Sequence, residues 1–309
     1  MKTMPFLCAL LLNPFFFIIT PLLSQTASQT AIVSNNSYHP PLNIPLILSG
    51  NFGELRSNHF HAGIDIKTQG TSGHEIFSIE KGYVFRIKVS TNGYGKALYI
   101  HHPERGISSV YGHLKEFNDK IASYVKKQQY KKQSFEIQLF PHRNQFKVKK
   151  GSLIGYSGNS GSSKGPHLHF EIRKMDDQHP LNPLHYNFDI RDNIPPQIFN
   201  IALYPKNNRS YINNENKKRI LDAKATQQNH YRIVGGDNIQ LQGSIGFGIR
   251  AFDFINDSPN WCGIYSIKLY IDSTLIYQHT MDEFAFSETR YINSMIDYEE
   301  KIRNNITLQ

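Results

Sequence analysis

Cysteine is nearly absent from the sequence, which contains only Cys8 and Cys262. Cys8 lies in an N-terminal apolar run that we predict to be removed, so the remaining chain has one thiol and no intramolecular disulfide. A zinc site built from several cysteines is excluded for the same reason. Any metal that this protein binds must therefore be held by histidine and carboxylate side chains.

Acidic residues are also scarce, since 25 Asp and Glu stand against 34 Lys and Arg and give a formal net charge of +9. Removal of residues 1–24, which contain one Lys and no acid, leaves a net charge of +8. A basic exported protein suits an anionic polymer such as a bacterial cell wall. The sequence shows no nucleic-acid-binding motif, so we expect no nucleic-acid partner.

No segment has the periodicity of an amphipathic helix of ordinary length. The glycine-rich loop at residues 158–165 lacks the G-x-x-x-x-G-K-[ST] pattern and precedes a strand, which argues against phosphate binding. We expect this loop to form the rim of a groove. Short β runs with turn residues between them predict an all-β first domain, with strands at 77–87, 97–101, 107–111, 148–156 and 168–173.

The N-terminus has the order of a secretory signal: Lys2, an apolar run over residues 6–23, and a polar stretch over residues 24–28. The run is just long enough to be an uncleaved membrane anchor. Asn13, Pro14 and Pro21 interrupt it and favour cleavage. We therefore predict a signal peptide at 1–24, an exported protein, and no stable membrane span after cleavage.

Composition divides the remaining chain into three parts. Residues 25–45 are polar and proline-containing and predict a mobile lead-in, followed by a domain over 46–190. Consecutive prolines at 195 and 196 mark a boundary. For residues 197–309 we predict an immunoglobulin-like β-sandwich, with a hairpin formed by residues 264–271 and 275–279. Residues 298–309 are charged and polar, so we predict no closing strand there. We interpret this end as that of a shortened form of a longer chain.

Residues 118–149 form a basic insert in the first domain. Nine basic residues, His142 included, stand there against the two acids Asp119 and Glu136. A solvated surface segment and an arm that contacts the cell wall are both compatible with this composition.

The strings His61-Ala62-Gly63-Ile64-Asp65 and His167-Leu168-His169 carry the candidate site. Side chains of a strand alternate between two faces, so each string places its polar residues on one face. Gly63 would leave a gap for a metal or substrate, and Glu171 would either orient an imidazole or be a solvated charge. Two imidazoles and a carboxylate are the ligands of a catalytic zinc site. Spacing alone does not decide whether His167 or His169 binds the metal.

Four ordered motifs and several framework glycines resemble the lysostaphin-like zinc endopeptidases of peptidase family M23 over residues 46–175. The motifs are Gly50-Asn51-Phe52-Gly53-Glu54-Leu55-Arg56, His61-x-Gly-x-Asp65, Tyr111-Gly112-His113-Leu114 and Gly165-Pro166-His167-Leu168-His169-Phe170. The framework strings include Lys81-Gly82-Tyr83-Val84 and Gly93-Tyr94-Gly95. The basic insert and the trailing β domain look like the exported Bacteroidetes-type variants, which implies the periplasm or cell envelope of a Gram-negative bacterium.

The resemblance implies a lysostaphin/LytM-like antiparallel β-sheet peptidase domain. It assigns His61, Asp65 and His169 as zinc ligands and gives His113 and His167 catalytic roles beside the metal. The implied activity is hydrolysis of peptide cross-links or stem peptides of peptidoglycan by metal-activated water. Two alternatives are a non-catalytic protein that binds or regulates the cell wall, and a protease that cleaves glycine-rich proteins.

Overall fold

The computed structural model describes residues 37–227 and 229–309. The predicted signal peptide at 1–24 and the first part of the predicted lead-in lie outside the described residues. Within the described ranges, no helix is both long and apolar enough to cross a membrane.

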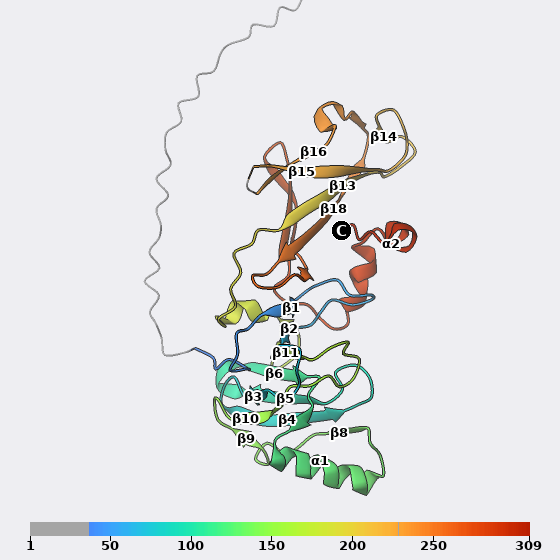
Figure 1. Ribbon diagram of the computed structural model, residues 1–309. Coiled ribbons are helices and arrows are strands. Elements are labelled where there is room, and N and C mark those ends of the chain that lie inside the picture. The colour runs from blue at the N-terminus through green and yellow to red at the C-terminus, as the bar shows by residue number, and fades with distance from the viewer. Residues whose placement is uncertain (1–36, 228) are drawn as a thin grey trace, which may run out of the picture. The chain divides into compact units, whose positions relative to one another are not determined.

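Nine strands within the described residues of the first domain form one antiparallel sheet (Figure 1). They are β1 (Leu48–Gly50), β2 (Ile64–Lys67), β4 (Gly82–Val89), β5 (Ala97–His102), β6 (Ile107–Gly112), β8 (Ile137–Leu139), β9 (Lys147–Val148), β11 (His167–Lys174) and β12 (Pro180–Leu181). The order of neighbours is β1-β2-β11-β6-β5-β4-β8, with β12 paired to β11 and β9 to β4. A smaller sheet has the order β3-β10-β7, with β3 (Glu75–Phe77), β7 (Glu116–Phe117) and β10 (Leu153–Tyr156). Short 3-10 turns follow β5 and β12 as η1 (Pro103–Arg105) and η2 (Pro183–Tyr186).

The apolar core contains residues of both sheets. On β11, Leu168, Phe170 and Ile172 are fully buried in this core and alternate with His167, His169 and Glu171. The predicted separation of an apolar and a polar face along this strand is therefore confirmed. The expected all-β character of the domain is confirmed as well, with one exception.

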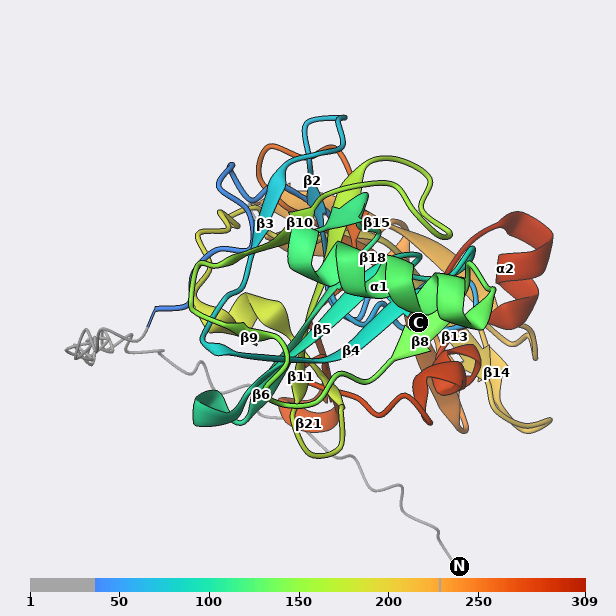
Figure 2. The ribbon, with the colours of Figure 1, turned by 90° about the horizontal axis from the view of Figure 1, so that it is seen from below.

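The exception is the helix α1 (Asp119–Lys132), which lies at the near end of the molecule in Figure 2. The side chain of Asn118 caps it by accepting a hydrogen bond from the Ile121 amide. Asp119 in the first turn and two lysines in the last turn suit the helix dipole. Among its side chains only Ile121 and Val125 are buried, so the apolar stripe was too narrow to reveal the helix.

The C-terminal region holds a further antiparallel sheet, whose five strands lie in the described residues in the order β16-β15-β13-β18-β19. These strands are β13 (Gln197–Pro205), β15 (Arg219–Gln227), β16 (His230–Ile233), β18 (Ile245–Phe254) and β19 (Trp261–Cys262). Two short strands, β14 (Tyr211–Ile212) and β17 (Leu241–Gln242), pair with each other. The region also contains η3 (Gly236–Asn238), η4 (Thr289–Ser294) and α2 (Tyr298–Asn304).

The predicted hairpin is present as β20 (Ser266–Ile271) and β21 (Thr274–Thr280). Asp272 and Ser273 between them have positive φ angles of 48° and 64°, as the tight turns of hairpins require. An immunoglobulin-like sandwich over residues 197–309 stays a prediction.

Two segments pack more closely on the first domain than the sequence suggested. Part of the predicted mobile lead-in is fixed, because Leu42 is 1% exposed in the core and the Pro41 carbonyl accepts a hydrogen bond from the Phe77 amide. Ile255 and Cys262, from beyond the predicted boundary, are buried in the same core. Apolar residues in both segments gain burial there, which a composition-based boundary does not reveal.

His102 at the end of β5 has a fully buried side chain. Its Nδ1 donates to the Lys81 carbonyl oxygen, and its Nε2 lies 2.7 Å from Ser109 Oγ. Burial lowers the pKa of this imidazole from 6.5 to about 4, so the folded protein keeps it neutral in mild acid.

Acid is therefore expected to destabilise the fold through His102. Above pH 6.5 the side chain is neutral in both states, whereas between pH 6.5 and about 4 only the unfolded chain takes up the proton. The loss of stability from this group over that range is about 3 kcal/mol. Denaturant unfolding at pH 7 and pH 4 should show a smaller acid loss for His102→Gln than for the wild type. An equal loss in the two proteins would contradict the assignment, and His142→Gln, at an exposed position, serves as the control.

Candidate metal and catalytic site

The candidate site lies where three neighbouring strands of the large sheet end close together. Asp65 on β2 is directly opposite His169 on β11, and His169 is opposite Gly112 at the end of β6. His113 follows Gly112 at once, and His61 precedes β2 in a loop that begins after β1. Strand register therefore brings together residues that are about a hundred positions apart in the sequence.

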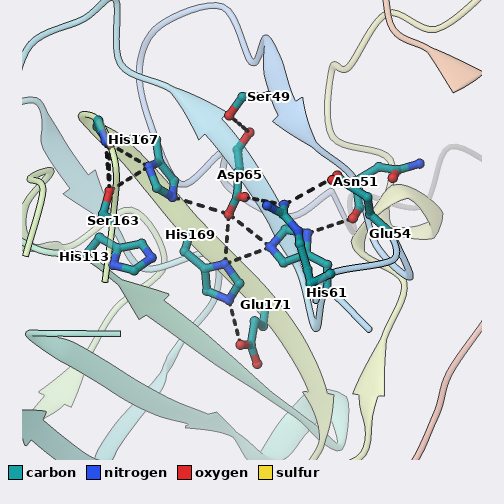
Figure 3. A network of polar contacts seen from close by, with 12 residues as sticks. Ser49, Asn51, Glu54, His61, Asp65, His113, Ser163, His167, His169 and Glu171 are labelled. Carbon is teal, nitrogen blue, oxygen red and sulfur yellow. Dashed lines mark hydrogen bonds and ion pairs between the residues drawn. The ribbon is translucent and has the colours of Figure 1, made fainter. Parts of the chain in front are cut away.

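His61, Asp65 and His169 form a compact buried cluster whose possible ligand atoms all lie within 4.8 Å of one another (Figure 3). Asp65 Oδ1 is 3.1 Å from His61 Nε2 and 2.9 Å from His169 Nδ1. The two imidazole nitrogens are 3.1 Å apart. Among the described residues, this is the group that fits a metal ion, and it consists of the three ligands that we predicted.

The outer nitrogen of each imidazole fixes which nitrogen faces the cluster. His61 Nδ1 donates to the Asn51 carbonyl oxygen at 2.7 Å, and His169 Nε2 donates to Glu171 Oε1 at 2.7 Å. The inward His61 Nε2 and His169 Nδ1 therefore carry lone pairs when the rings are neutral. Two lone pairs and a carboxylate oxygen at such short distances repel one another unless a proton or a cation lies between them. These three ligand atoms thus fit a divalent metal ion that keeps one further coordination position open.

The charge of the cluster is determined by a buried row of ionic groups, namely Asp65, His169, Glu171 and Arg173. Burial opposes ionisation of Glu171, but the Arg173 guanidinium and the hydrogen bond from His169 lower the pKa of this carboxyl to about 2. Burial likewise opposes a charge on His169, yet the hydrogen bonds to Asp65 and Glu171 raise its pKa to about 9. Despite its burial, Asp65 has a pKa well below the usual value because of the surrounding imidazoles. The site therefore attracts positive charge to the position between its donors.

Glu171 resolves an alternative that the sequence left open. Its side chain is fully buried and accepts from His169 on one oxygen and from Arg173 Nε on the other, at 2.6 Å. It is thus an orienting carboxylate and not a solvated charge at a strand end. Gly63 serves a different purpose from the one predicted, because a Cβ there would lie 2.3 Å from the Phe170 carbonyl oxygen. Its missing side chain admits the β11 backbone, not a metal or substrate.

His113 and His167 lie beside the cluster with their ring centroids 4.7 Å apart. The loop at 158–165 holds both rings, because His113 Nδ1 donates to the Ser160 carbonyl oxygen and His167 Nδ1 to that of Gly165, each at 2.8 Å. His167 Nε2 is 3.5 Å from Asp65 Oδ1. His113 Nε2 has no hydrogen-bond partner among the described residues and carries the free lone pair of the neutral ring.

Two features mark His113 as a constrained residue. Its φ of 59° lies in the left-handed region, which costs a residue other than glycine about 1 kcal/mol. Burial, together with the nearby His169 and His167, lowers its pKa to about 4, so the ring is neutral at pH 7. A buried, neutral imidazole with a free nitrogen is suited to accepting a proton.

Sequence reasoning missed several supporting residues of the site. Arg56 Nη2 donates to Asp65 Oδ2 at 2.9 Å, and the Tyr94 ring stacks on His169 at a centroid distance of 4.7 Å. Asn51 holds the predicted ligand His61, and Arg173 holds Glu171, which in turn holds His169. Arg56, Asn51 and Tyr94 stand in the motif strings, which was the available signal. His59, two residues before His61, is exposed and bonds to Asn58.

The first domain is similar in sequence to known proteins. The family model "Peptidase family M23" matches residues 59–131 and 136–183, which leaves only residues 132–135 between the two ranges. The DD-carboxypeptidase/endopeptidase Mpg of Neisseria meningitidis is 31% identical over 131 residues, which are 42% of this chain and 23% of that protein. The match thus spans about a quarter of the length of this relative.

Two solved structures are similar over half of the chain or slightly less. Csd3 of Helicobacter pylori is 28% identical with a TM-score of 0.34, covering 48% of this chain and 34% of that one. The catalytic domain of the prophage-encoded M23 protein EnpA of Enterococcus faecalis is 24% identical with a TM-score of 0.35, covering 50% of this chain and 100% of that one. The family match covers most of the domain whose antiparallel sheet bears the predicted motifs, so this domain is similar to the lysostaphin-like domains of peptidase family M23.

Proposed function

We propose that the protein is an exported zinc metalloendopeptidase that hydrolyses peptide cross-links or stem peptides of bacterial peptidoglycan. The observation that carries this proposal is the convergence of His61 Nε2, Asp65 Oδ1 and His169 Nδ1 beside two further imidazoles. The relative named as a DD-carboxypeptidase/endopeptidase supports cleavage of such peptides. The predicted signal peptide and the positive net charge support an extracytoplasmic, anionic substrate.

His61, Asp65 and His169 would hold the zinc ion, with Asn51 and Glu171 keeping the imidazole lone pairs directed inward. When bound, zinc supplies a Lewis acid that activates water and polarises the carbonyl of the bond to be cleaved. Arg56 remains on the second oxygen of Asp65 and holds that carboxylate in its orientation.

The neighbouring imidazoles would move the protons of the reaction. His113 is neutral and has a free Nε2, so it can accept the proton of the attacking water and later return one to the leaving amine. His167, held by the Gly165 carbonyl, can stabilise the negative charge that develops on the carbonyl oxygen. The loop at 158–165 fixes both rings before substrate binds, so little reorganisation is needed.

Purified zinc-loaded protein should release soluble peptides from peptidoglycan sacculi faster than from a glycine-rich polypeptide. The measurement is the release of a labelled fragment from each substrate at equal substrate concentration. His279→Ala, which alters a histidine on β21 outside the site, is the control for the variants discussed below. Tight binding to sacculi without release would favour the non-catalytic alternative, and faster cleavage of the glycine-rich polypeptide would favour a protein substrate.

A further inference from the structure

Asn51 connects the metal cluster to the C-terminal region. Its carbonyl oxygen accepts the hydrogen bond from His61 Nδ1 at 2.7 Å. Its side-chain amide pairs with Gly263, 212 residues away, through Nδ2 to the Gly263 carbonyl and from the Gly263 amide to Oδ1, both at 2.8 Å. Asn51 is 4% exposed, so these bonds are made away from water. Figure 3 shows Asn51 on the side of His61 that faces away from Asp65.

Gly263 is suited to this contact because it has no side chain. A Cβ at this position would lie 2.8 Å from Glu54 Cα, a backbone atom that cannot move out of the way cheaply. The two hydrogen bonds between the Asn51 amide and the Gly263 peptide group satisfy one donor and one acceptor on each side. Loss of the Asn51 side-chain amide would leave the Gly263 amide and carbonyl buried without hydrogen-bond partners, which lowers the stability of the folded state.

The same loop is held a second time, just before His61. The Phe60 amide donates to Thr289 Oγ1 at 2.8 Å. Around this contact, Phe52, Phe60 and Ala62 form one buried cluster with three C-terminal residues, Met281, Phe284 and Ile292. The loop that carries His61 is thus anchored to the C-terminal region at both of its ends. Backbone bonds between Gly53 and His61, and between His61 and Glu54, join the two anchors.

We propose that Asn51 is a positioning residue through which residues 261–295 set the metal affinity of the peptidase domain. The proposal rests on the zinc site proposed above. A hydrogen-bond partner on the outer nitrogen of a ligand imidazole typically changes metal affinity by about 10- to 100-fold. Here that partner is a backbone carbonyl, and the orientation of the carbonyl depends on the Gly263 contact. The C-terminal region is then a working part of the metal site and not an appended domain.

The first test is the zinc affinity of the full-length Asn51→Ala variant, measured by competition with a chromophoric chelator. We expect a loss of about tenfold or more relative to the wild type. The matched control is Asn256→Ala, which breaks a similar pair, since Asn256 Nδ2 bonds to Asn193 Oδ1 and the Asn193 amide bonds to Asn256 Oδ1, both at 2.9 Å. This control should bind zinc like the wild type. Thr289→Val removes the second anchor, leaves Asn51 in place, and should weaken zinc binding even if Asn51→Ala does not fold.

The second test uses the unmodified protein, because coupling between two sites is reciprocal. Zinc should slow amide hydrogen exchange at Gly263 and in residues 281–292, measured by mass spectrometry with and without the metal. Unchanged exchange, together with wild-type zinc affinity in Thr289→Val, would overturn the proposal. A wild-type protein that binds no zinc at all would instead contradict the proposed function, so the two failures are distinguishable.

Discussion

Replacement of His169 by alanine is expected to abolish zinc binding and peptide hydrolysis together. His169 is 3% exposed, and its Nδ1 is within 3.1 Å of the donor atoms of both other ligands. The variant retains two ligands and leaves Glu171 without the imidazole that it orients. We expect zinc content to fall from about one ion per chain to near zero, and hydrolysis to fall by about 10³-fold or more.

The measurements are metal content by elemental analysis and release of peptides from sacculi. His279→Ala should keep both values, since this residue lies outside the cluster. Hydrolysis at the wild-type rate in His169→Ala would refute the ligand assignment. The fold should survive the substitution, because Glu171 keeps its ion pair with Arg173.

Replacement of His113 by alanine is expected to separate the two properties that His169→Ala removes together. No ligand atom of the cluster belongs to His113, so zinc should stay bound at about one ion per chain. The free Nε2 is lost, and with it the group that we propose accepts the proton. Hydrolysis should fall by about 10²- to 10⁴-fold at constant zinc content, the usual range for a general base.

His113→Gly is the companion variant, because the φ of 59° at this position strains alanine and not glycine. The two variants should differ in thermal stability but lose the same activity. If His113→Gly hydrolyses sacculi at nearly the wild-type rate, the imidazole has no part in the reaction. If both variants lose zinc, His113 supports the metal and does not transfer protons.

Much of the site could be predicted because strands impose a period of two. The alternation of His167, His169 and Glu171 with apolar residues was sufficient to place three polar groups on one face of β11. Asp65 then had to face the same side, since the register sets it opposite His169. The choice of His169 over His167 as the ligand, and any role for His113, came from the family resemblance and not from spacing.

The features that sequence reasoning missed depend on contacts between distant residues. Nothing near Asn51 indicates that its amide meets Gly263, which follows 212 positions later. Likewise, the ends of α1 are stabilised by the Asn118 cap and by charges that suit the helix dipole, while only two of its residues are buried. His102 is the last residue of a strand of ordinary pattern, and only the fold shows that it points into the interior. Tertiary packing decides such cases, and local pattern does not record it.

The most direct test of the central claim is hydrolysis of sacculi in water enriched in oxygen-18, followed by mass spectrometry of the released fragments. The account predicts new amine and carboxyl ends at a peptide bond, with one heavy oxygen in the new carboxyl group, and no such product after zinc is removed. Fragments cut in the glycan strand, or peptide products that form equally well without the metal, would contradict it.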